Sequence, residues 1–198
     1  MTQSPDALQA VIPVVAVLRR LGVRHYICGS FASVFYGVSR TTADIDLVAE
    51  LSAAHVPAFV KSLQGQYYVD PRMILDAIAR DSCFNVIHLP TSFKVDVFVA
   101  KRRLYDRAAM ERVREDSFDD DVPDARFFLP SPEDVILAKL EWYRLGDEVS
   151  ERQWSDVLGV MKVSGPTLDR AYMERWAAEL GVADLLAKAW DEARIEGL

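Results

Sequence analysis

Two aspartates one residue apart, Asp44 and Asp46, lie in the apolar run ADIDLVA and are the side chains best suited to chemistry. A β-strand points successive side chains to opposite faces, so both carboxylates share one face while Ile45 and Leu47 turn to the core. Two carboxylates about 4 Å apart repel each other by roughly 4 kcal/mol at an effective dielectric constant of about 20. We therefore expect a cation between them, or enough exposure for water to screen them.

A small turn upstream and a third acid downstream extend this pattern. Gly29 and Ser30 follow a β-prone run and precede a helical one, and the backbone N–H groups at a helix start attract anions such as phosphate. Asp96 lies in the valine-rich run FKVDVFV, and an acid on an otherwise apolar central strand needs an explanation. Carboxylate oxygens are ligands that Mg²⁺ prefers. The pattern predicts a nucleotide phosphate at Ser30 and Mg²⁺ at the three acids.

The overall charge narrows the classes of partner. The 198 residues carry a net charge of −7, which argues against a surface that binds nucleic acid through bulk electrostatics. Positive charge is concentrated between Lys101 and Arg114. This basic cluster could receive an RNA backbone or a triphosphate, but an exposed helix in which Glu111 and Glu115 alternate with arginines explains much of it.

Cysteine content and hydropathy indicate the compartment. Neither Cys28 nor Cys83 has a second cysteine or a histidine at metal-ligand spacing, so we expect two buried thiols in a reducing cytoplasm. The N-terminal apolar run is too short to cross a bilayer and contains Pro13. We expect a first helix in water, a cytoplasmic location and no membrane contact.

Cap, turn and periodicity signals place these residues on helices and strands. Apolar spacing predicts helices over about residues 5–21, 31–36, 52–64, 72–80, 104–114, 132–145, 150–163, 168–180 and 183–195. Runs rich in β-branched and aromatic residues predict strands over about residues 24–28, 44–50, 67–69, 82–88, 93–99 and 126–129. The short connection at residues 89–92 predicts a hairpin, and residues 115–124 are expected to form a solvated acidic loop.

This order of elements predicts an α/β (α+β) fold in two parts. Residues 1–130 would form a core in which a small mixed β-sheet is flanked by helices. Residues 131–198 would form a C-terminal helical bundle that closes one side of a cleft. The core would carry the three acids and the Gly-Ser turn.

The chain resembles the nucleotidyltransferase superfamily of the polymerase β type, whose signature of Gly-Ser, Asp-x-Asp and a third Asp is matched position by position by Gly29, Ser30, Asp44, Asp46 and Asp96. The segments FKVDVFV, SPEDVILAKLEWYR and SERQWSDVLGVM look more specifically like the bacterial AbiEii-like nucleotidyltransferase toxins. The matches cover residues from about 24 to 161. They imply that the α/β part is a nucleotidyltransferase core.

The resemblance also implies a reaction. It is the Mg²⁺-dependent transfer of a nucleoside monophosphate from an NTP to an acceptor hydroxyl, with pyrophosphate leaving. Asp44 and Asp46 would bridge two Mg²⁺ ions, or Mn²⁺ in their place. Asp96 would complete the metal nearer the acceptor and take the acceptor's proton. Gly29 and Ser30 would contact the β- and γ-phosphates.

Helical and strand cations are further candidates for nucleotide binding. Lys139 matches the helical lysine of the AbiEii-like subgroup and would neutralise the triphosphate, and Arg152 and Asp156 match its later polar positions. Solvated helix charges are the alternative for Lys139 and Arg152, since Lys and Arg are usually exposed. Lys94 shares a face with Asp96 and either pairs with the acids or reaches a phosphate.

The acceptor stays open at this level. RNA, particularly tRNA, a protein hydroxyl and a small molecule such as an aminoglycoside all fit the motifs. The resemblance to toxins also suggests an antitoxin protein as a partner. The rival functions are a catalytically silent nucleotide- or partner-binding member of a toxin–antitoxin or defence pair, and a phosphohydrolase that uses the same acids. The complete set of three acids favours catalysis, because without a cation it would be a costly like-charge cluster.

Overall fold

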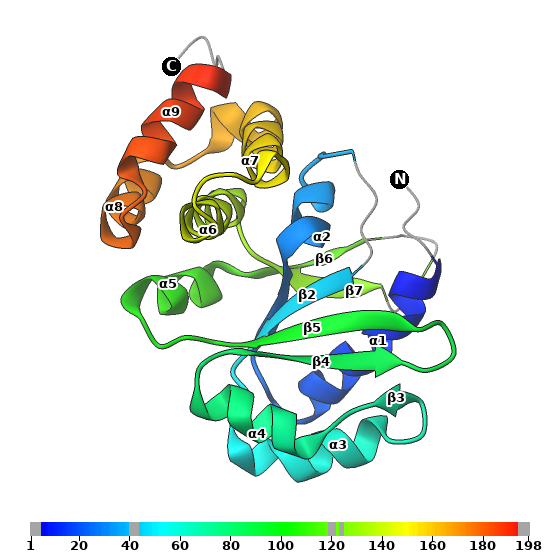
Figure 1. Cartoon of the computed structure of the whole chain (residues 1–198). Coiled ribbons are helices and arrows are strands. Elements are labelled where there is room, and N and C mark those ends of the chain that lie inside the picture. The colour runs from blue at the N-terminus through cyan, green and yellow to red at the C-terminus, as the bar shows by residue number, and fades with distance from the viewer. Residues whose placement is uncertain (1–4, 40–43, 119–121, 123–124, 194–198) are drawn as a thin grey trace. The chain divides into compact units, whose positions relative to one another are not determined.

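The computed structural model describes residues 5–39, 44–118, 122 and 125–193. The chain divides into two compact units, whose elements are labelled in Figure 1. The N-terminal unit comprises the residues up to 31 together with 41–129, and the C-terminal unit comprises 32–40 together with 130–198. The expected division at residues 130 and 131 placed the segment 32–40 in the core, whereas it groups with the C-terminal helices.

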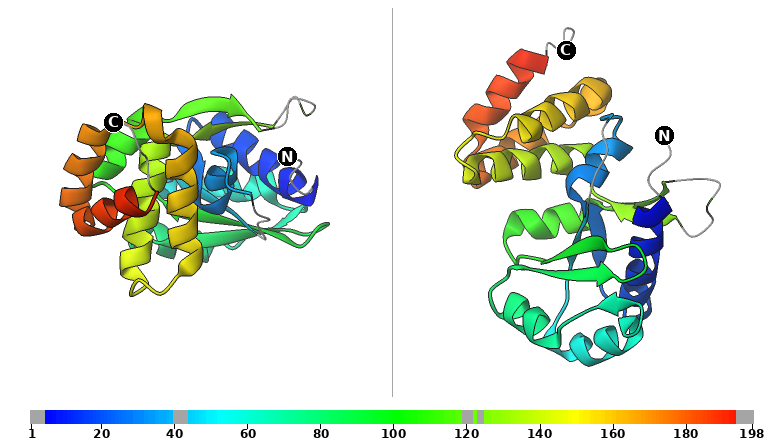
Figure 2. Two further views of the ribbon diagram at one scale, coloured as in Figure 1. Left: turned by 90° about the horizontal axis from the view of Figure 1, so that it is seen from above. Right: turned by 45° about the vertical axis from the view of Figure 1, so that its right-hand side comes forward.

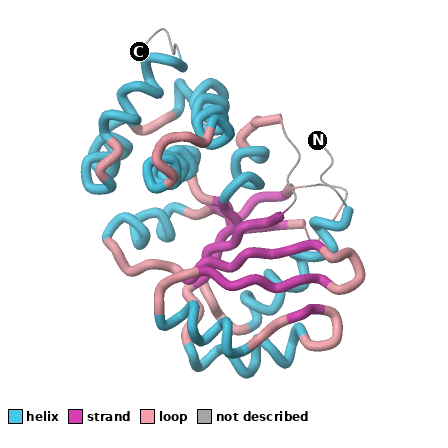
Figure 3. The backbone as a smooth tube through the Cα atoms, in the orientation of Figure 1, coloured by secondary structure: helices cyan, strands magenta, loops and turns pink. Residues whose placement is uncertain are grey.

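A five-stranded mixed sheet forms the centre of the N-terminal unit, in the order β1-β2-β5-β4-β3 (Figure 3). Parallel pairing joins β2 to β5, and the other neighbouring pairs are antiparallel. The expected small mixed sheet and the hairpin of β4 and β5 are therefore confirmed. The strands are β1 (His25–Cys28), β2 (Asp44–Ala49), β3 (Tyr67–Tyr68), β4 (Cys83–His88) and β5 (Phe93–Val99).

One face of this sheet is the core of the N-terminal unit. Ile27, Ile45, Leu47, Val95 and Val97 are all fully buried, as the alternation of side chains along each strand requires. Burying a side chain of this size contributes about 1.5–3 kcal/mol. A slip of one residue in any strand would move its apolar set to the opposite face, so the core fixes the register. The polar residues between them are thereby held on the other face.

Three helices cover the core face of the sheet (Figure 1, Figure 2). They are α1 (Pro5–Arg20), α3 (Val56–Leu63) and α4 (Pro71–Ala79), and the 3₁₀ turn η1 (Ala53–His55) precedes α3. α4 begins where the Asp70 side chain accepts a hydrogen bond from the backbone N–H of Arg72 at 2.7 Å. All three helices lie where the apolar spacing predicted them.

A second sheet of two strands departs from the expectation. β6 (Arg114–Ser117) pairs antiparallel with β7 (Arg126–Leu129), although residues 115–117 were expected to belong to a solvated loop. The sequence of β6 carries no apolar pattern. Its backbone groups are satisfied by pairing with β7, whose Phe127 and Leu129 are buried, so the partner strand imposed the conformation. Residues 119–121 and 123–124 of the expected loop lie outside the described residues.

Two further helices in this part of the chain differ from expectation at one end. α2 (Gly29–Phe35) begins at the Gly-Ser pair itself, which was expected to be a turn before a helix starting at residue 31. α5 (Leu104–Arg112) ends two residues early, because Arg114 already belongs to β6. Neither change alters the expected strand positions of Asp44, Asp46 and Asp96.

The C-terminal unit is helical, as expected. Its helices are α6 (Pro132–Leu145), α7 (Glu151–Ser164), α8 (Arg170–Leu180) and α9 (Ala183–Ala193), with the 3₁₀ turn η2 (Gly165–Thr167) after α7. The side chains of Ser131, Ser150 and Asp169 accept hydrogen bonds from backbone N–H groups at the starts of α6, α7 and α8. Within the described ranges, no helix combines the length and apolar content needed to cross a membrane.

The segment 32–40, which includes the last four residues of α2, groups with the C-terminal unit and packs closely on α7. A Cβ atom built on Gly159 of α7 would lie 2.8 Å from Cγ2 of Val38, so only glycine lets the segment approach this closely. Tyr36 donates a hydrogen bond from its hydroxyl to the carbonyl of Pro130 at 2.7 Å. These contacts account for the grouping of residues 32–40 with the helices.

Candidate active site

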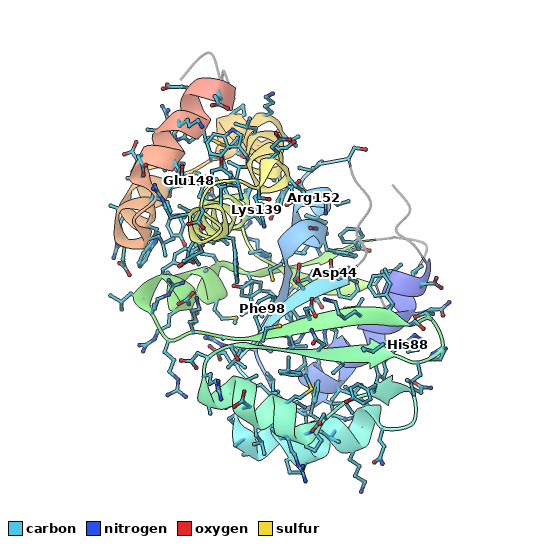
Figure 4. The ribbon with its side chains drawn as sticks, in the orientation of Figure 1. Asp44, His88, Phe98, Lys139, Glu148 and Arg152 are labelled. Atoms are coloured by element: carbon cyan, nitrogen blue, oxygen red, sulfur yellow. The ribbon has the colours of Figure 1, made fainter. Side chains whose placement is uncertain are left out.

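The parallel pairing of β2 and β5 brings the three acids together. Asp46 lies opposite Asp96, and Asp44 lies opposite Lys94. Neighbouring strands are about 4.8 Å apart, and residues opposite each other point to the same face. Asp44, labelled in Figure 4, therefore lies on the half-exposed face of the sheet beside the other two aspartates. The structure brings together the three aspartates that the sequence singled out.

Lys94 lies between two of these acids. Its Nζ atom is 2.6 Å from Oδ2 of Asp96 and 3.8 Å from Oδ2 of Asp44. The hydrogen bond with Asp96 raises the pKa of Lys94 above its usual value, and the charges of Asp96, Asp44 and Asp46 add to this effect. Lys94 therefore carries the positive charge that the cluster was expected to require, and the pairing alternative for this lysine is the arrangement observed.

Asp96 is the most buried of the three candidate metal ligands, and each of its carboxylate oxygens accepts a hydrogen bond. Its residue is 8% exposed. Oδ1 accepts a hydrogen bond from the side-chain amide of Asn85, which lies opposite Asp96 in β4, and Oδ2 accepts the one from Lys94. A buried carboxylate with both oxygens engaged is held in a fixed orientation. Asn85 thus belongs to the candidate site, although sequence reasoning missed it.

The register of the hairpin could have identified Asn85 from the sequence. His88 and Phe93 are the last residues to pair across the connection, and counting back three residues on each side places Asn85 opposite Asp96. The alternation in β4 also puts Asn85 on the face opposite the buried Phe84. The hairpin register therefore predicts that the Asn85 amide lies next to the Asp96 carboxylate.

Gly29 is required by the close approach of Asp46. The residue has φ +60°, and a Cβ atom built on it would lie 1.9 Å from Oδ2 of Asp46. Any side chain at this position would therefore collide with the carboxylate as well as strain the backbone. The Gly-Ser pair and the second acid are thus one packed arrangement, with Ser30 half-buried at the start of α2.

The donor set fits a divalent cation, but not in the side-chain arrangement observed. Among the described residues, no group of three His, Cys, Asp or Glu side chains is arranged to hold a metal ion. In this arrangement Oδ2 of Asp96 is engaged by Lys94. The Lys94 side chain is 43% exposed and can turn toward water, which would leave carboxylate oxygens of the kind that Mg²⁺ binds.

The two cysteines lie on this face of the sheet, and their environment limits their chemistry. Cys28 is opposite Asp46, and Cys83 is opposite Phe98. Burial raises the pKa of the Cys83 thiol to about 12, with a further contribution from Asp96 and Asp46. Since the thiolate is the reactive form, Cys83 is not a nucleophile at neutral pH.

Lys139 and Arg152 belong to the C-terminal unit and differ in environment (Figure 4). Lys139 is buried on α6, and its Nζ donates to Oδ2 of Asp156 at 2.8 Å and to Oε1 of Gln153 at 3.2 Å. The alternative of a solvated helix charge is therefore wrong for Lys139. Arg152 is exposed on α7, as that alternative expects.

The basic cluster between Lys101 and Arg114 is partly paired. Arg103 Nε lies 2.7 Å from Oδ2 of Asp106 in the first turn of α5. Lys101 and Arg102 are exposed. This pairing and the exposure of its neighbours are typical of a solvated helix face.

Comparison with known proteins places the fold. No protein-family model matches the sequence, and a search of curated proteins finds no significant match. The structure is similar to an antigenic nucleotidyltransferase-like protein from Paracoccidioides brasiliensis, with a TM-score of 0.60 and 16% identity over 98% of this chain and 94% of that one.

Two further solved structures share the fold. One is the antibiotic-resistance factor ANT(2'')-Ia, with a TM-score of 0.54 and 16% identity over 94% of this chain and 98% of that one. The other is the lincosamide antibiotic adenylyltransferase LnuA in its lincomycin-bound form, with a TM-score of 0.51 and 15% identity over 82% of this chain and 99% of that one. At these identities the comparison establishes the fold, which is that of nucleotidyltransferase-like proteins.

Proposed function

We propose that the protein is a nucleotidyltransferase that uses Mg²⁺, or Mn²⁺ in its place, to move a nucleoside monophosphate from an NTP to an acceptor hydroxyl. The observation that carries the proposal is the placement of Asp46 opposite Asp96 on adjacent parallel strands, with Asp44 on the same face. The fold supports the same class of reaction. The match of the Gly-Ser pair and the three acids to the polymerase β type signature adds the roles of the residues.

In this proposal the site residues of the N-terminal unit have distinct roles. Asp44 and Asp46 hold the divalent ions, which, when bound, stabilise charge on the attacking and leaving oxygens. Asp96 would complete the set of ligands for the ion nearer the acceptor and take the proton of the acceptor hydroxyl, and Asn85 keeps the Asp96 carboxylate in place. Gly29 leaves room for Asp46.

The phosphate contacts are a separate part of the proposal. Ser30 binds the β- and γ-phosphates together with the backbone of Gly29. Lys139 and Arg152 are candidate triphosphate ligands through the resemblance to the AbiEii-like subgroup. The buried contact with Asp156 supports a second task for Lys139, which is to join α6 to α7.

A small hydroxyl-bearing molecule is the acceptor class that the similar structures favour. LnuA is a lincosamide antibiotic adenylyltransferase whose structure has lincomycin bound, and ANT(2'')-Ia is an antibiotic-resistance factor. The net charge of −7 disfavours a large RNA surface, and a tRNA or protein hydroxyl is the second choice. An antitoxin partner and a cytoplasmic location complete the proposal through the resemblance and the cysteine content.

The test is an acceptor screen with α-labelled NTPs. The protein is incubated with each labelled NTP, Mg²⁺ and cell extract separated into small molecules, RNA and protein, and pyrophosphate release is followed in parallel. We expect label in one fraction, pyrophosphate release, and neither with Asp46→Asn. Label-free phosphate release would instead indicate a phosphohydrolase. Binding of Mg²⁺ and NTP without label in any fraction would support the catalytically silent alternative.

A further inference from the structure

We propose that Lys94 and the divalent cation exchange at the same carboxylates. In this scheme the Lys94 ammonium neutralises Asp44 and Asp96 until metal binds, is then released, and binds the triphosphate of the incoming NTP. The inference rests on the proposed function, and it adds a positioning residue that neither the Gly-Ser turn nor the three acids of the signature includes.

Metal and lysine require the same atom. Oδ1 of Asp96 accepts the hydrogen bond from Asn85, so Oδ2 is the oxygen that Asp96 can offer to a cation without losing that bond. Oδ2 is 2.6 Å from Nζ of Lys94. An ammonium and a divalent cation at one carboxylate oxygen repel each other strongly, so binding of one favours release of the other.

Lys94 approaches the acids from β5, a strand with neighbours on both sides in the sheet. Its Cα lies opposite that of Asp44 in the pairing of β2 with β5, and it is two residues from Asp96 on the same strand face. The ammonium therefore contacts acids on both strands at 2.6 Å and 3.8 Å. A metal bound by the same two strands would take the place of that ammonium.

Release of Lys94 requires little free energy. The Lys94 side chain is 43% exposed and that of Asp44 is 40% exposed, so the displaced ammonium regains water as it turns away. A lysine side chain is also a flexible four-carbon chain that can move without any change in the backbone. The sheet and its core stay intact during the exchange.

The nucleotide gives the displaced ammonium a new partner. A displaced ammonium and a divalent ion a few ångströms apart repel each other, so metal alone should bind weakly. The phosphates of an NTP on that metal bring negative charge to the same face and attract the ammonium. Metal and NTP should therefore bind cooperatively, and Lys94 should carry a large part of that coupling.

The test is a titration of three proteins with Mn²⁺, first alone and then with a non-hydrolysable NTP analogue. The proteins are the wild type, Lys94→Met, and Lys61→Met, which removes the same charge from an exposed position on α3. Lys94→Met should bind Mn²⁺ alone about tenfold more tightly, since the competing charge-assisted hydrogen bond is gone. It should also lose most of the gain in affinity that the analogue gives the wild type. Lys61→Met should match the wild type.

The outcomes separate this inference from the proposed function. Equal Mn²⁺ affinity in Lys94→Met and the wild type overturns the exchange and leaves the metal assignment intact. Absence of Mn²⁺ binding to both proteins up to millimolar concentration overturns the metal assignment of the proposed function, and the exchange with it. Lys94→Arg keeps the positive charge, so a Lys94→Arg protein that binds Mn²⁺ alone as tightly as Lys94→Met would overturn the exchange.

A second measurement needs no variant and therefore holds even if Lys94→Met fails to fold. Lysines of the wild-type protein are acetylated briefly in EDTA, in Mg²⁺, and in Mg²⁺ with the NTP analogue, and the modified peptides are quantified by mass spectrometry. Lys94 should react slowly in EDTA, several times faster in Mg²⁺, and slowly again with the analogue, relative to Lys61. Unchanged reactivity of Lys94 in all three conditions would overturn the exchange.

Discussion

Two lysine–aspartate pairs in this molecule have similar geometry and opposite surroundings. Nζ of Lys94 lies 2.6 Å from Oδ2 of Asp96 in the N-terminal unit, and Nζ of Lys139 lies 2.8 Å from Oδ2 of Asp156 in the C-terminal unit. The side chains of the first pair are 43% and 12% exposed, whereas those of the second are 6% and 3% exposed. Distance alone therefore does not distinguish the pairs.

Exposure decides what each pair can do. A partly solvated lysine can leave its partner at small cost, because water replaces the lost hydrogen bond. A buried lysine has no such replacement, and removing one partner leaves an uncompensated charge. We infer that the Lys94 pair is built for exchange and the Lys139 pair for holding α6 against α7. Substitutions can test that distinction, beginning with the acids on which the exchange depends.

The largest effect is expected for Asp44→Asn. Nucleotidyl transfer should fall on the order of 10³-fold or more, because a charged metal ligand is lost from a group of residues that act as a unit. The Asp44 side chain is 40% exposed, so the free energy of unfolding should change by less than about 0.5 kcal/mol. Label transfer and urea denaturation measure the two quantities. Asp76→Asn, an exposed acid on α4, is the control and should transfer normally.

The next effect separates the two lysines. Lys139→Met should destabilise the protein by about 3–5 kcal/mol, since Asp156 would remain buried and charged. Lys94→Met should cost clearly less, because Asp96 keeps the hydrogen bond from Asn85 and the Asp44 side chain is 40% exposed. Urea denaturation of both variants measures the difference, and the double variant Lys139→Met with Asp156→Leu should regain most of the loss. Equal destabilisation by the two lysine substitutions would contradict the distinction drawn from exposure.

Gly29→Ala tests the contact between the Gly-Ser pair and the acids. The added Cβ would meet the Asp46 carboxylate, so we expect about 1–3 kcal/mol of destabilisation together with weaker Mn²⁺ binding. Gly22→Ala is a matched control, because Gly22 has φ +68° and no described atom within 4 Å of the added Cβ. It should cost about 1 kcal/mol from the backbone alone and leave Mn²⁺ binding unchanged. Loss of metal binding in both variants would exclude the direct collision as the cause.

The smallest effect concerns His25, a buried histidine at the start of β1. Burial lowers the pKa of His25, and its buried Nε2 atom has no hydrogen-bond partner among the residues that the structure describes. Below pH 6.5 His25 is protonated in the unfolded chain but stays largely neutral in the folded protein. The free energy of unfolding therefore decreases as the pH falls. Between pH 7 and 5 the loss should be at most about 1.4 kcal/mol per pH unit.

His25→Gln should flatten this part of the stability curve. Chemical denaturation at pH 7, 6 and 5 measures the slope for both proteins. Glu50, whose pKa is lowered by the hydrogen bond from Arg24, titrates mainly below this window and is present in both proteins, so it cancels in their comparison. An unchanged slope in His25→Gln would assign the acid sensitivity to another group.

Most of the fold could be predicted because local pattern and tertiary contact agree. The strand that carries Asp44 and Asp46 alternates apolar and polar residues, and the core enforces that alternation. Several helices begin at Ser, Asp and Pro signals that the structure uses as caps. β6 could not be predicted, because its strand conformation depends on pairing with β7 rather than on its own residues.

The acids of the candidate site could be predicted by type, but their partners depend on register. Lys94 was predicted on the same face as Asp96, with pairing as one alternative, whereas the second partner, Asn85, follows from the hairpin register. Helical spacing could not predict the burial of Lys139, because that burial depends on the packing of α7 against α6. Long-range packing therefore limits what the sequence alone can assign.

A crystal structure with Mn²⁺ and a non-hydrolysable NTP analogue tests the central claim most directly, because the anomalous signal of manganese locates the metal. The claim is that the three acids hold a divalent cation and that Lys94 leaves Asp44 and Asp96 when this cation binds. We predict manganese at the carboxylates of Asp44, Asp46 and Asp96, with Lys94 turned away from Oδ2 of Asp96 toward the phosphates. Manganese elsewhere, with Lys94 still bridging Asp44 and Asp96, would contradict this claim.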